Sequence, residues 1–443
     1  MGAILIKKRR FPKIFFGWWT VLVSSILSLW GSGYYHYGFS ALFKPIASEL
    51  GFSRAVTSVP AAIGRFEGGI EGPISGWATD KFGPRWIVLF GVFMVSLGLI
   101  MMNFIQSLWA FYVAWGFILG TGINVALSIP LDTAITNWFV KKRGLALSIR
   151  WVFSGLSGVL ILPLIALLIY TQGWRMTCLI GGVVMVLVGL PLAWFCLKRY
   201  RPEYYGMLPD GATVKGEVGD TKRTIDRGVK YAAEVEEAEF TLRQAIRTPA
   251  LWLIVTAHGI HAMASPAINV HGIPFLTDMG IEPIRAASMI AMMALASVPA
   301  RFVAGLVVDR SRKNYLRFVI GGAYLLQAIG FGIFVLNQTI PMIYVWFILY
   351  GLGHGAALAG FVMVLARYFG RKAFGSIRGL SSLVMTPVGV AAPIYAGWVY
   401  DTTDSYIIAF ILIGVLVAFA AVLLFMARPP KTPAQVTDVR KIF

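Results

Sequence analysis

The sequence has few charged residues and almost no cysteine. Asp, Glu, Lys and Arg make up 13% of its 443 residues, whereas soluble domains carry about 25%. Its two cysteines, Cys178 and Cys196, lie in apolar runs and form neither a disulfide framework nor a zinc site. The sequence also lacks the HExxH metal motif and the GxxxxGK(S/T) motif for ATP phosphates. We therefore expect neither a soluble protein nor an enzyme, and no cofactor.

Apolar residues are abundant instead, at 58% of the chain with a mean hydropathy of +0.73. A helix needs about 20 mostly apolar residues to cross a bilayer. The sequence predicts an all-α membrane protein with twelve transmembrane helices in two pseudo-symmetric six-helix bundles. The predicted spans are 16–43, 55–79, 86–106, 109–137, 144–170, 175–197, 249–277, 284–308, 315–336, 341–366, 377–400 and 405–427.

One long polar stretch divides these helices into two sets of six. The predicted division is an N-terminal bundle over 1–197, a cytoplasmic linker over 198–247, a C-terminal bundle over 248–427 and a cytoplasmic tail over 428–443. The basic N-terminal segment leads into a long helix without a small-residue cleavage site, so we expect no cleavable signal.

The basic residues predict the orientation of the helices. With the N-terminus inside, 32 of the 39 Lys and Arg residues fall on the cytoplasmic side, including those in the loop 367–378, and only four fall outside. This asymmetry favours a multi-pass protein of the plasma or inner membrane with both termini cytoplasmic. The net charge of +19 is then mainly a topology signal, and no nucleic-acid partner is expected.

The two halves contain an internal repeat. Two parallel six-helix repeats imply a pseudo-two-fold axis along the membrane normal and a substrate site between the halves. The sequence WFVKKRG at 138–144 is also similar to YFGRKAFG at 368–375. Three positions recur at an offset of 229 residues, with Gly51, Gly76 and Asp80 matching Gly280, Gly305 and Asp309.

The loop after the second predicted helix contains Gly76, Asp80, Gly83 and Arg85 in the pattern GxxxDKxGxR. This pattern resembles the signature of the major facilitator superfamily between helices two and three. The start Gly-Trp-Trp at 17–19 and the stretch NWFVKKRGLALSIRWVFSG at 137–155 are similar to the monocarboxylate transporters and their oxalate/formate-exchanging bacterial relatives. In the resembling family the loop pattern, here with its counterparts Gly305 and Asp309, takes part in conformational change.

The resemblance implies secondary active transport of a small organic anion by alternating access. Symport of a monocarboxylate such as lactate or pyruvate with a proton is the function it favours. Exchange of a dicarboxylate for a monocarboxylate is the alternative, and a sensor that binds its ligand without moving it is less favoured. The implied partners are a small organic anion, a proton and the lipid bilayer, with the protein acting as a monomer.

The resemblance also implies an anion site. In those relatives an arginine of the eighth helix binds the carboxylate, and Arg301, eight residues before Asp309, occupies the matching position. A guanidinium can hold a carboxylate through two parallel hydrogen bonds; the alternative for Arg301 is an ion pair with a glutamate of the second helix. The pattern departs at Ser297, where animal members have aspartate, and in the first helix, where His36 or Tyr37 replaces lysine.

Other ionisable residues within the predicted spans are candidate functional groups, because a charge in a bilayer is costly unless it is paired or faces water. Asp132 and Arg150 lie at similar depth on neighbouring helices. They form a structural ion pair, or Arg150 is a second substrate cation and Asp132 a proton carrier. Glu67 and Glu71 are four positions apart and share a helix face, where they either carry a proton or make hydrogen bonds between helices.

All five histidines fall within predicted spans. His258 and His261 are one turn apart on the seventh helix, and His36 lies on the first. These imidazoles could line the cavity, bind substrate and couple it to a proton, or they could simply pack between helices. A metal site is the least favoured interpretation, since no further ligand motif accompanies them.

A polar-aromatic cluster that includes Tyr34 and Tyr37 lies toward the outer end of the first helix. It either anchors the helix at the membrane interface or forms an outer gate that contacts substrate. Asn124, in the fourth helix, is a further candidate donor to the substrate.

Overall fold

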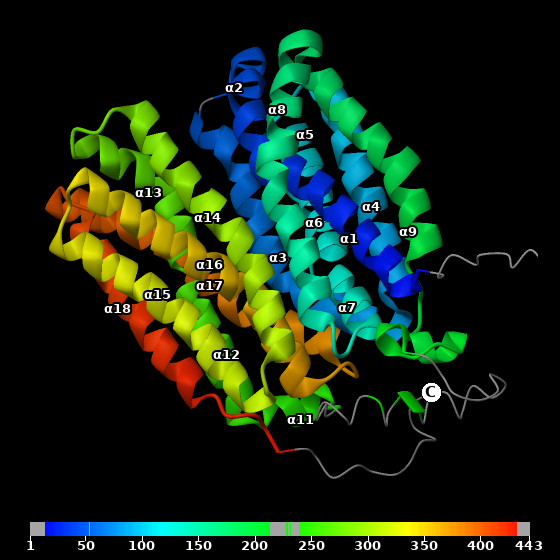
Figure 1. Cartoon of the computed structure of the whole chain (residues 1–443). Helices are drawn as coiled ribbons and strands as arrows, with labels where there is room; N and C mark the ends of the chain where they lie inside the picture. Colours follow the sequence, from blue (N-terminus) through cyan, green and yellow to red (C-terminus); the bar gives the residue numbers. More distant parts are fainter. Residues whose placement is uncertain (1–13, 53, 213–226, 229–230, 232–238, 432–443) are drawn as a thin grey trace, which may run out of the picture.

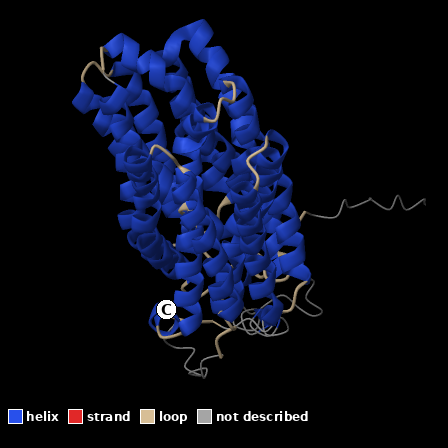
Figure 2. Cartoon of the chain, turned by 90° about the vertical axis from the view of Figure 1, so that its left-hand side faces the viewer, coloured by secondary structure: helices blue, strands red, loops and turns tan. Residues whose placement is uncertain are grey.

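The computed structural model describes residues 14–52, 54–212, 227–228, 231 and 239–431. All regular elements in these ranges are helices, and the loops lie at helix ends (Figure 2). All five basic residues of the N-terminal segment, much of the linker and most of the tail lie outside the described residues.

The N-terminal half holds the first six predicted spans. Its elements are α1 (Phe16–Ser32), η1 (Gly33–Tyr37), α2 (Gly38–Leu50), α3 (Arg54–Phe82), α4 (Pro84–Met101), η2 (Met102–Phe104), α5 (Leu108–Phe111), η3 (Tyr112–Leu119), α6 (Gly120–Leu127), α7 (Ile129–Trp138), α8 (Arg143–Val184), η4 (Met185–Gly189) and α9 (Leu190–Cys196).

The linker contributes short helices and the C-terminal half six longer spans. These elements are η5 (Pro202–Tyr205), η6 (Pro209–Gly211), α11 (Leu242–Ile246), α12 (Pro249–His261), α13 (Ala264–Asp278), α14 (Pro283–Arg310), η7 (Lys313–Tyr315), α15 (Leu316–Leu336), α16 (Ile340–Phe369), α17 (Phe374–Thr403) and α18 (Ile407–Met426).

Each of the twelve predicted spans is occupied by helix, as expected where lipid offers no partner to backbone N–H and C=O groups. Among the described residues, nine continuous helical stretches are long and apolar enough to cross a membrane. One of them, Arg143–Cys196, covers two predicted spans. It bends at Gly173, whose φ of 78° is a conformation that glycine adopts without steric cost.

The helices form two groups that approach each other closely at one end. In Figure 1 they converge where α11 and the linker lie, which we call the linker end, and separate where α2 and α13 lie, which we call the far end. Helix α3 lies beside α17, and α8 lies beside α14. One apolar core contains only residues from 23–197, and the other is built mostly from 240–427.

The internal repeat is confirmed by the backbone. Gly51 and Gly280, the first repeated pair, both have positive φ, at 67° and 79°. Each follows the helix that ends at the far end, α2 or α13. The other repeated positions, described below, make equivalent contacts between the halves.

Candidate functional site between the two halves

Each half caps a helix of the other half with one aspartate. The Asp309 carboxylate, at the end of α14, accepts hydrogen bonds from the backbone N–H groups of Gly144 at 2.6 Å and Leu145 at 2.8 Å. These N–H groups belong to the first turn of α8, where no carbonyl within the helix can accept them. The negative charge also suits the positive end of the helix dipole.

Asp80 makes the equivalent contact in the first repeat. Its carboxylate accepts hydrogen bonds from Gly375 N at 3.0 Å and from Ser376 N at 2.7 Å, in the first turn of α17. The Ser376 hydroxyl adds a bond of 2.6 Å. We call the two arrangements the aspartate locks, because each joins the halves at the linker end.

The glycines of the repeat allow this close approach. A Cβ on Gly76 would lie 2.1 Å from the Gly375 carbonyl oxygen, and one on Gly305 would lie 2.5 Å from that of Gly144. Both distances are far below van der Waals contact, so the helices could not touch here with any larger residue. Gly83, also in the loop pattern, has a φ of 85° and is followed by Pro84, the first residue of α4.

Two further arginines join the halves at the linker end and were missed by the sequence analysis. Arg143 donates through Nη1 to the Ala366 carbonyl oxygen of α16 at 3.0 Å, and its side chain is buried. Arg371 donates to the Asn137 carbonyl oxygen of α7 at 3.2 Å and to Glu203 in the linker at 3.0 Å. In the sequence, both arginines contribute only to the count of basic residues in cytoplasmic loops. Their loop positions gave no sign that they would be buried.

Arg301 lies where α14 packs against α8. It is 8% exposed and donates through Nη1 to the Trp151 carbonyl oxygen at 2.8 Å. Its Nη2 lies 3.5 Å from the Ser297 hydroxyl, and its Nε has no hydrogen-bond partner among the described residues. The alternative ion pair with Glu67 or Glu71 is not among the ion pairs of the described part of the chain.

Arg150 forms the ion pair with Asp132 that the sequence predicts. Nη1 of Arg150 lies 2.5 Å from Asp132 Oδ1, and both side chains are almost completely buried. The guanidinium also donates to Ser28 Oγ at 3.1 Å and to the Leu127 carbonyl oxygen. That carbonyl is available because the helix breaks at Ser128, between α6 and α7. In this conformation the guanidinium of Arg150 is hydrogen-bonded to protein groups.

Arg378 requires a correction. Arg378 was counted with the cytoplasmic charges of 367–378, although it is also the second residue of the predicted span 377–400; it lies on α17 and is 8% exposed. Its guanidinium sits 4.9 Å from the centre of the Phe361 ring and interacts electrostatically with Asp132. Asp132 therefore faces two cations, Arg150 from its own half and Arg378 from the other.

Glu67 and Glu71 both lie on α3 and are partly buried. One carboxylate oxygen of each, Oε2, is buried and has no hydrogen-bond partner among the described residues. Glu67 Oε2 lies beside Gly120, 3.1 Å from where a Cβ would stand. Asn124, one turn further along α6, donates to the Gly64 carbonyl oxygen at 2.8 Å. These groups therefore gather where α3 meets α6, inside the N-terminal half.

The aromatic cluster of the first span divides into different environments. Tyr34 is fully buried and donates to the Thr177 carbonyl oxygen at 3.1 Å. It packs within the N-terminal half, so the suggested contact with substrate does not fit its position. Tyr37 packs on Gly158 of α8 and interacts electrostatically with Arg301. His36 is exposed, with its ring 5.1 Å from that of Tyr35.

His258 and His261 lie inside the C-terminal half rather than on an open cavity wall. They are 5% and 0% exposed. His258 Nδ1 is hydrogen-bonded to the Tyr324 hydroxyl at 2.7 Å. The described residues contain no group of three or more His, Cys, Asp or Glu side chains placed to hold a metal ion.

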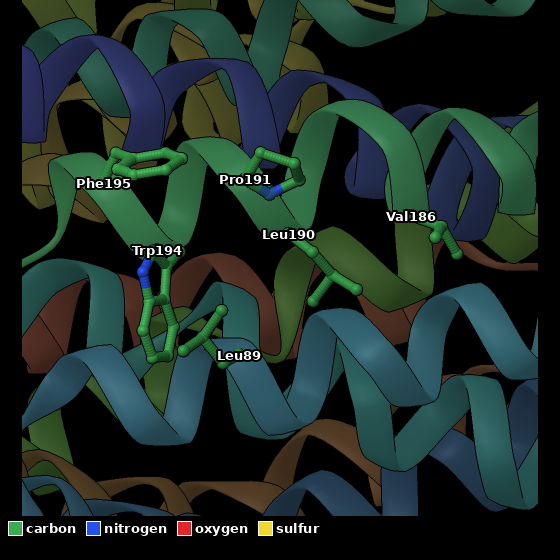
Figure 3. Close-up of a pocket in the computed structure, with 6 residues that line it drawn as sticks. All are labelled: Leu89, Val186, Leu190, Pro191, Trp194 and Phe195. Carbon is green, nitrogen blue, oxygen red and sulfur yellow. The ribbon is translucent and has the colours of Figure 1, made fainter.

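Two hollows in the surface differ in character. One of about 510 Å³ lies on the outside of the N-terminal half between α4 and the segment η4–α9 (Figure 3). Its lining is apolar, which suits lipid chains rather than an anion: Leu89, Val186, Leu190, Pro191, Trp194 and Phe195. The other, of about 440 Å³, is lined by α13, α17 and Ala262 just before α13, and its lining includes Ser382 and Thr386.

Two bundles joined by repeated locks, with a buried cation at their boundary, define a membrane transporter fold. A profile of the Major Facilitator Superfamily matches residues 21–389 and 316–442. The chain belongs to this superfamily.

Curated relatives include monocarboxylate transporters. Monocarboxylate transporter 2 of Rattus norvegicus is 24% identical over 425 residues, which cover 93% of this chain and 83% of the relative. Monocarboxylate transporter 12 of Mus musculus is 25% identical over 366 residues, covering 80% and 74%. The chain is therefore a multi-pass membrane transporter related to the monocarboxylate transporters.

Solved structures share the fold. The proton:xylose symporter XylE superposes with a TM-score of 0.67 at 11% identity, covering 93% of this chain and 95% of the symporter. The human organic anion transporter MFSD10 gives 0.61 at 16% identity, covering 92% and 97%. At these identities the likeness shows the twelve-helix fold alone.

Proposed function

We propose that this protein is a secondary active transporter that moves a small monocarboxylate such as lactate together with a proton. The single observation that carries the proposal is the position of Arg301. Its guanidinium is buried at the boundary of the halves, and its hydrogen-bond partners among the described residues are a carbonyl and, at the limit of length, a hydroxyl. A buried cation with neutral partners favours binding of an anion. Tyr37, across the boundary, is a second group that can contact it.

Coupling to a proton makes the transported pair of ions electrically neutral. A lone anion that crosses the membrane works against about 2.3 kcal/mol per 100 mV, whereas a proton and a monocarboxylate together carry no net charge. Glu67, Glu71, Asp132 and the buried histidines are the groups that could take the proton. The substrate itself is released chemically unchanged.

Transport would proceed by alternating access between the bundles 1–197 and 248–427. The distribution of basic residues puts the linker end at the cytoplasm, with both termini cytoplasmic in the plasma or inner membrane. The aspartate locks then keep the cytoplasmic end closed, and release of Asp80 and Asp309 opens it. A monomer suffices for this cycle, since both bundles lie in one chain.

Exchange of a dicarboxylate for a monocarboxylate is the second candidate. It would use Arg150 as a second substrate cation, and Arg378 adds positive charge on the other side of Asp132. Because Arg150 already holds Asp132, Ser28 and a carbonyl, a substrate would first have to replace these partners. This requirement favours the monocarboxylate.

The proposal is tested by uptake of radiolabelled lactate into proteoliposomes, with and without an inward proton gradient. We expect the gradient to stimulate uptake by the wild type, and Arg301→Gln to abolish it. Arg285→Gln is the matched control, because it removes the same charge from an exposed position of α14. Uptake that ignores the gradient and requires internal oxalate would support the exchanger. No lactate uptake in any condition would refute the proposed substrate.

A further inference from the structure

Three histidines and two aromatic residues form a continuous stack in the C-terminal half. The rings of His258 and His261, both on α12, are 5.1 Å apart, and His261 is 5.4 Å from His354 on α16. Tyr324 of α15 stacks on His261 at 4.6 Å. Phe361 stacks on His258 at 3.9 Å with an angle of only 3° between the planes. We call the three histidines the histidine ladder.

One end of the ladder reaches the candidate anion site. His354 precedes Gly355, where α16 lies directly on α14: a Cβ on Gly355 would be 2.1 Å from the Ser297 carbonyl oxygen. The hydroxyl of Ser297 is in turn next to Arg301. The positive charge of Arg301 acts electrostatically on His354. The charge of Arg301, the proposed anion-binding residue, and the protonation of His354, the last imidazole of the ladder, therefore influence each other.

The other end of the ladder reaches Arg378, whose guanidinium lies 4.9 Å from the centre of the Phe361 ring and acts electrostatically on His258. Among the described residues, the charged groups that act directly on the ladder are a cation at each end, and the nearest carboxylate, Asp132, acts on Arg378 rather than on the histidines. The groups that face it are Arg301 from α14, Tyr324 and Gln327 from α15, Tyr350 from α16 and Arg378 from α17.

We propose that the histidine ladder is the proton-binding site and that a carboxylate bound at Arg301 drives its protonation. With the anion site empty, a proton on the ladder would add a third positive charge between two arginines. A bound carboxylate cancels the charge of Arg301 and removes that repulsion at His354. Nδ1 of His354 has no hydrogen-bond partner among the described residues, so none of them competes with a proton for this nitrogen.

The step is simple proton transfer. A hydronium ion that reaches the ladder gives its proton to an imidazole nitrogen, so a new N–H bond forms as one O–H bond of the hydronium breaks and a water molecule is released. The imidazolium and the carboxylate together are neutral. By linkage, the proton raises the affinity for the anion by the same factor as the anion raises the affinity for the proton. This inference rests on the proposed function and names the group that couples the two ions.

The test compares two assays on the same proteoliposomes, with His354→Gln and His261→Gln as variants. Counterflow exchange of labelled lactate needs no net proton movement, whereas accumulation against a concentration gradient does. We expect both variants to retain exchange and to lose gradient-driven accumulation. His271→Gln is the control, because His271 lies on α13 with its own partners, Pro393 and Tyr406, outside the ladder. It should keep both activities.

A second readout is the pH dependence of lactate affinity. If one proton binds with each anion, affinity in the wild type should rise by up to about tenfold per pH unit of acidification, and this dependence should flatten in His354→Gln. A variant that still accumulates lactate, or that loses exchange and accumulation together, would overturn the ladder. Wild type that transports no lactate would refute the proposed function itself, and this inference with it.

Discussion

Gly144 and Gly305 face each other so closely that a Cβ on Gly144 would lie 2.4 Å from the Gly305 carbonyl oxygen. They come from α8 and α14, one helix of each half, next to the lock made by Asp309. The closed linker end therefore depends on two positions without a side chain. Only glycine satisfies both, since even alanine would force the two backbones apart.

Gly144→Ala should shift the population away from the closed linker end. We expect this because the new methyl group would meet backbone atoms, which cannot rotate away as a side chain could. Spin labels at Ser107 and Asn337, exposed positions in loops at the far end, would measure the change as a shorter distance between the halves.

Gly322→Ala is the control for this change, because a Cβ on Gly322 meets nothing within 4 Å. It should leave the distance distribution of the wild type in place. An unchanged distribution in Gly144→Ala would contradict the role of the glycine pair in closure.

The aspartate locks should contribute to closure separately. Asp309→Asn keeps one acceptor oxygen but loses the second and the charge, so we expect the closed form to lose about 1 kcal/mol, the usual cost of a lost helix cap. Asp80→Asn should cost a similar amount, and the double variant about the sum. The same spin-label distances provide the measurement, with exposed Asp401→Asn as the control. An effect of one lock only would contradict their equivalence.

The pair Asp132–Arg150 should matter most for stability. Removing Asp132 leaves the charges of Arg150 and Arg378 buried without a carboxylate, and removing Arg150 leaves Asp132 with Arg378 as its remaining cation. Breaking a buried ion pair in this way costs about 3–5 kcal/mol. We therefore expect Asp132→Asn and Arg150→Gln each to lower the thermal unfolding temperature in detergent markedly. Replacing both by apolar residues, as in Asp132→Leu with Arg150→Met, should restore part of the loss. Single variants as stable as the wild type would contradict the ion pair.

A pH-dependent contact is expected at the far end, beyond the predicted span 16–43. Glu49 accepts hydrogen bonds from Arg175 at 2.7 Å and Trp174 at 2.6 Å. The bond from Arg175 holds the pKa of the Glu49 carboxyl below its ordinary value, against a smaller opposing effect of burial. A lowered pKa stabilises the folded state above the unfolded pKa, and the contribution disappears as the pH falls through the folded value.

Glu49→Gln should therefore lower the unfolding temperature slightly at pH 7 and not at strongly acidic pH. The side chain is about half exposed, so we expect at most about 1 kcal/mol. Glu282→Gln, at an exposed position before α14, is the control and should show no such convergence with the wild type. A difference that grows on acidification would contradict the sign.

The sequence predicted the number and order of helices, because an apolar run of sufficient length has no other stable structure in lipid. It also predicted the repeat and the pair of Asp132 with Arg150, since both follow from spacing along the chain. These features need no knowledge of which helix faces which.

Burial of the loop cations could not be predicted. Arg378, Arg143 and Arg371 were counted by segment, and a count contains no information on which side chains turn inward. For a related reason, the sequence did not indicate that Tyr34 and His258 lie inside their own halves rather than at the boundary between the halves. In a helix that is apolar on all sides, no amphipathic pattern indicates which face lines the boundary between halves.

The locks also bear on ancestry. The hydrogen bonds that each aspartate accepts among the described residues come from the other repeat, so a single six-helix unit would not supply them. A progenitor with only one such unit would have needed a second copy of itself, side by side and in the same orientation about a two-fold axis along the membrane normal, to form these hydrogen bonds. Gene fusion would then have converted contacts between two identical subunits into contacts within one chain, and left each half free to diverge around Arg301 on one side and Glu67 on the other.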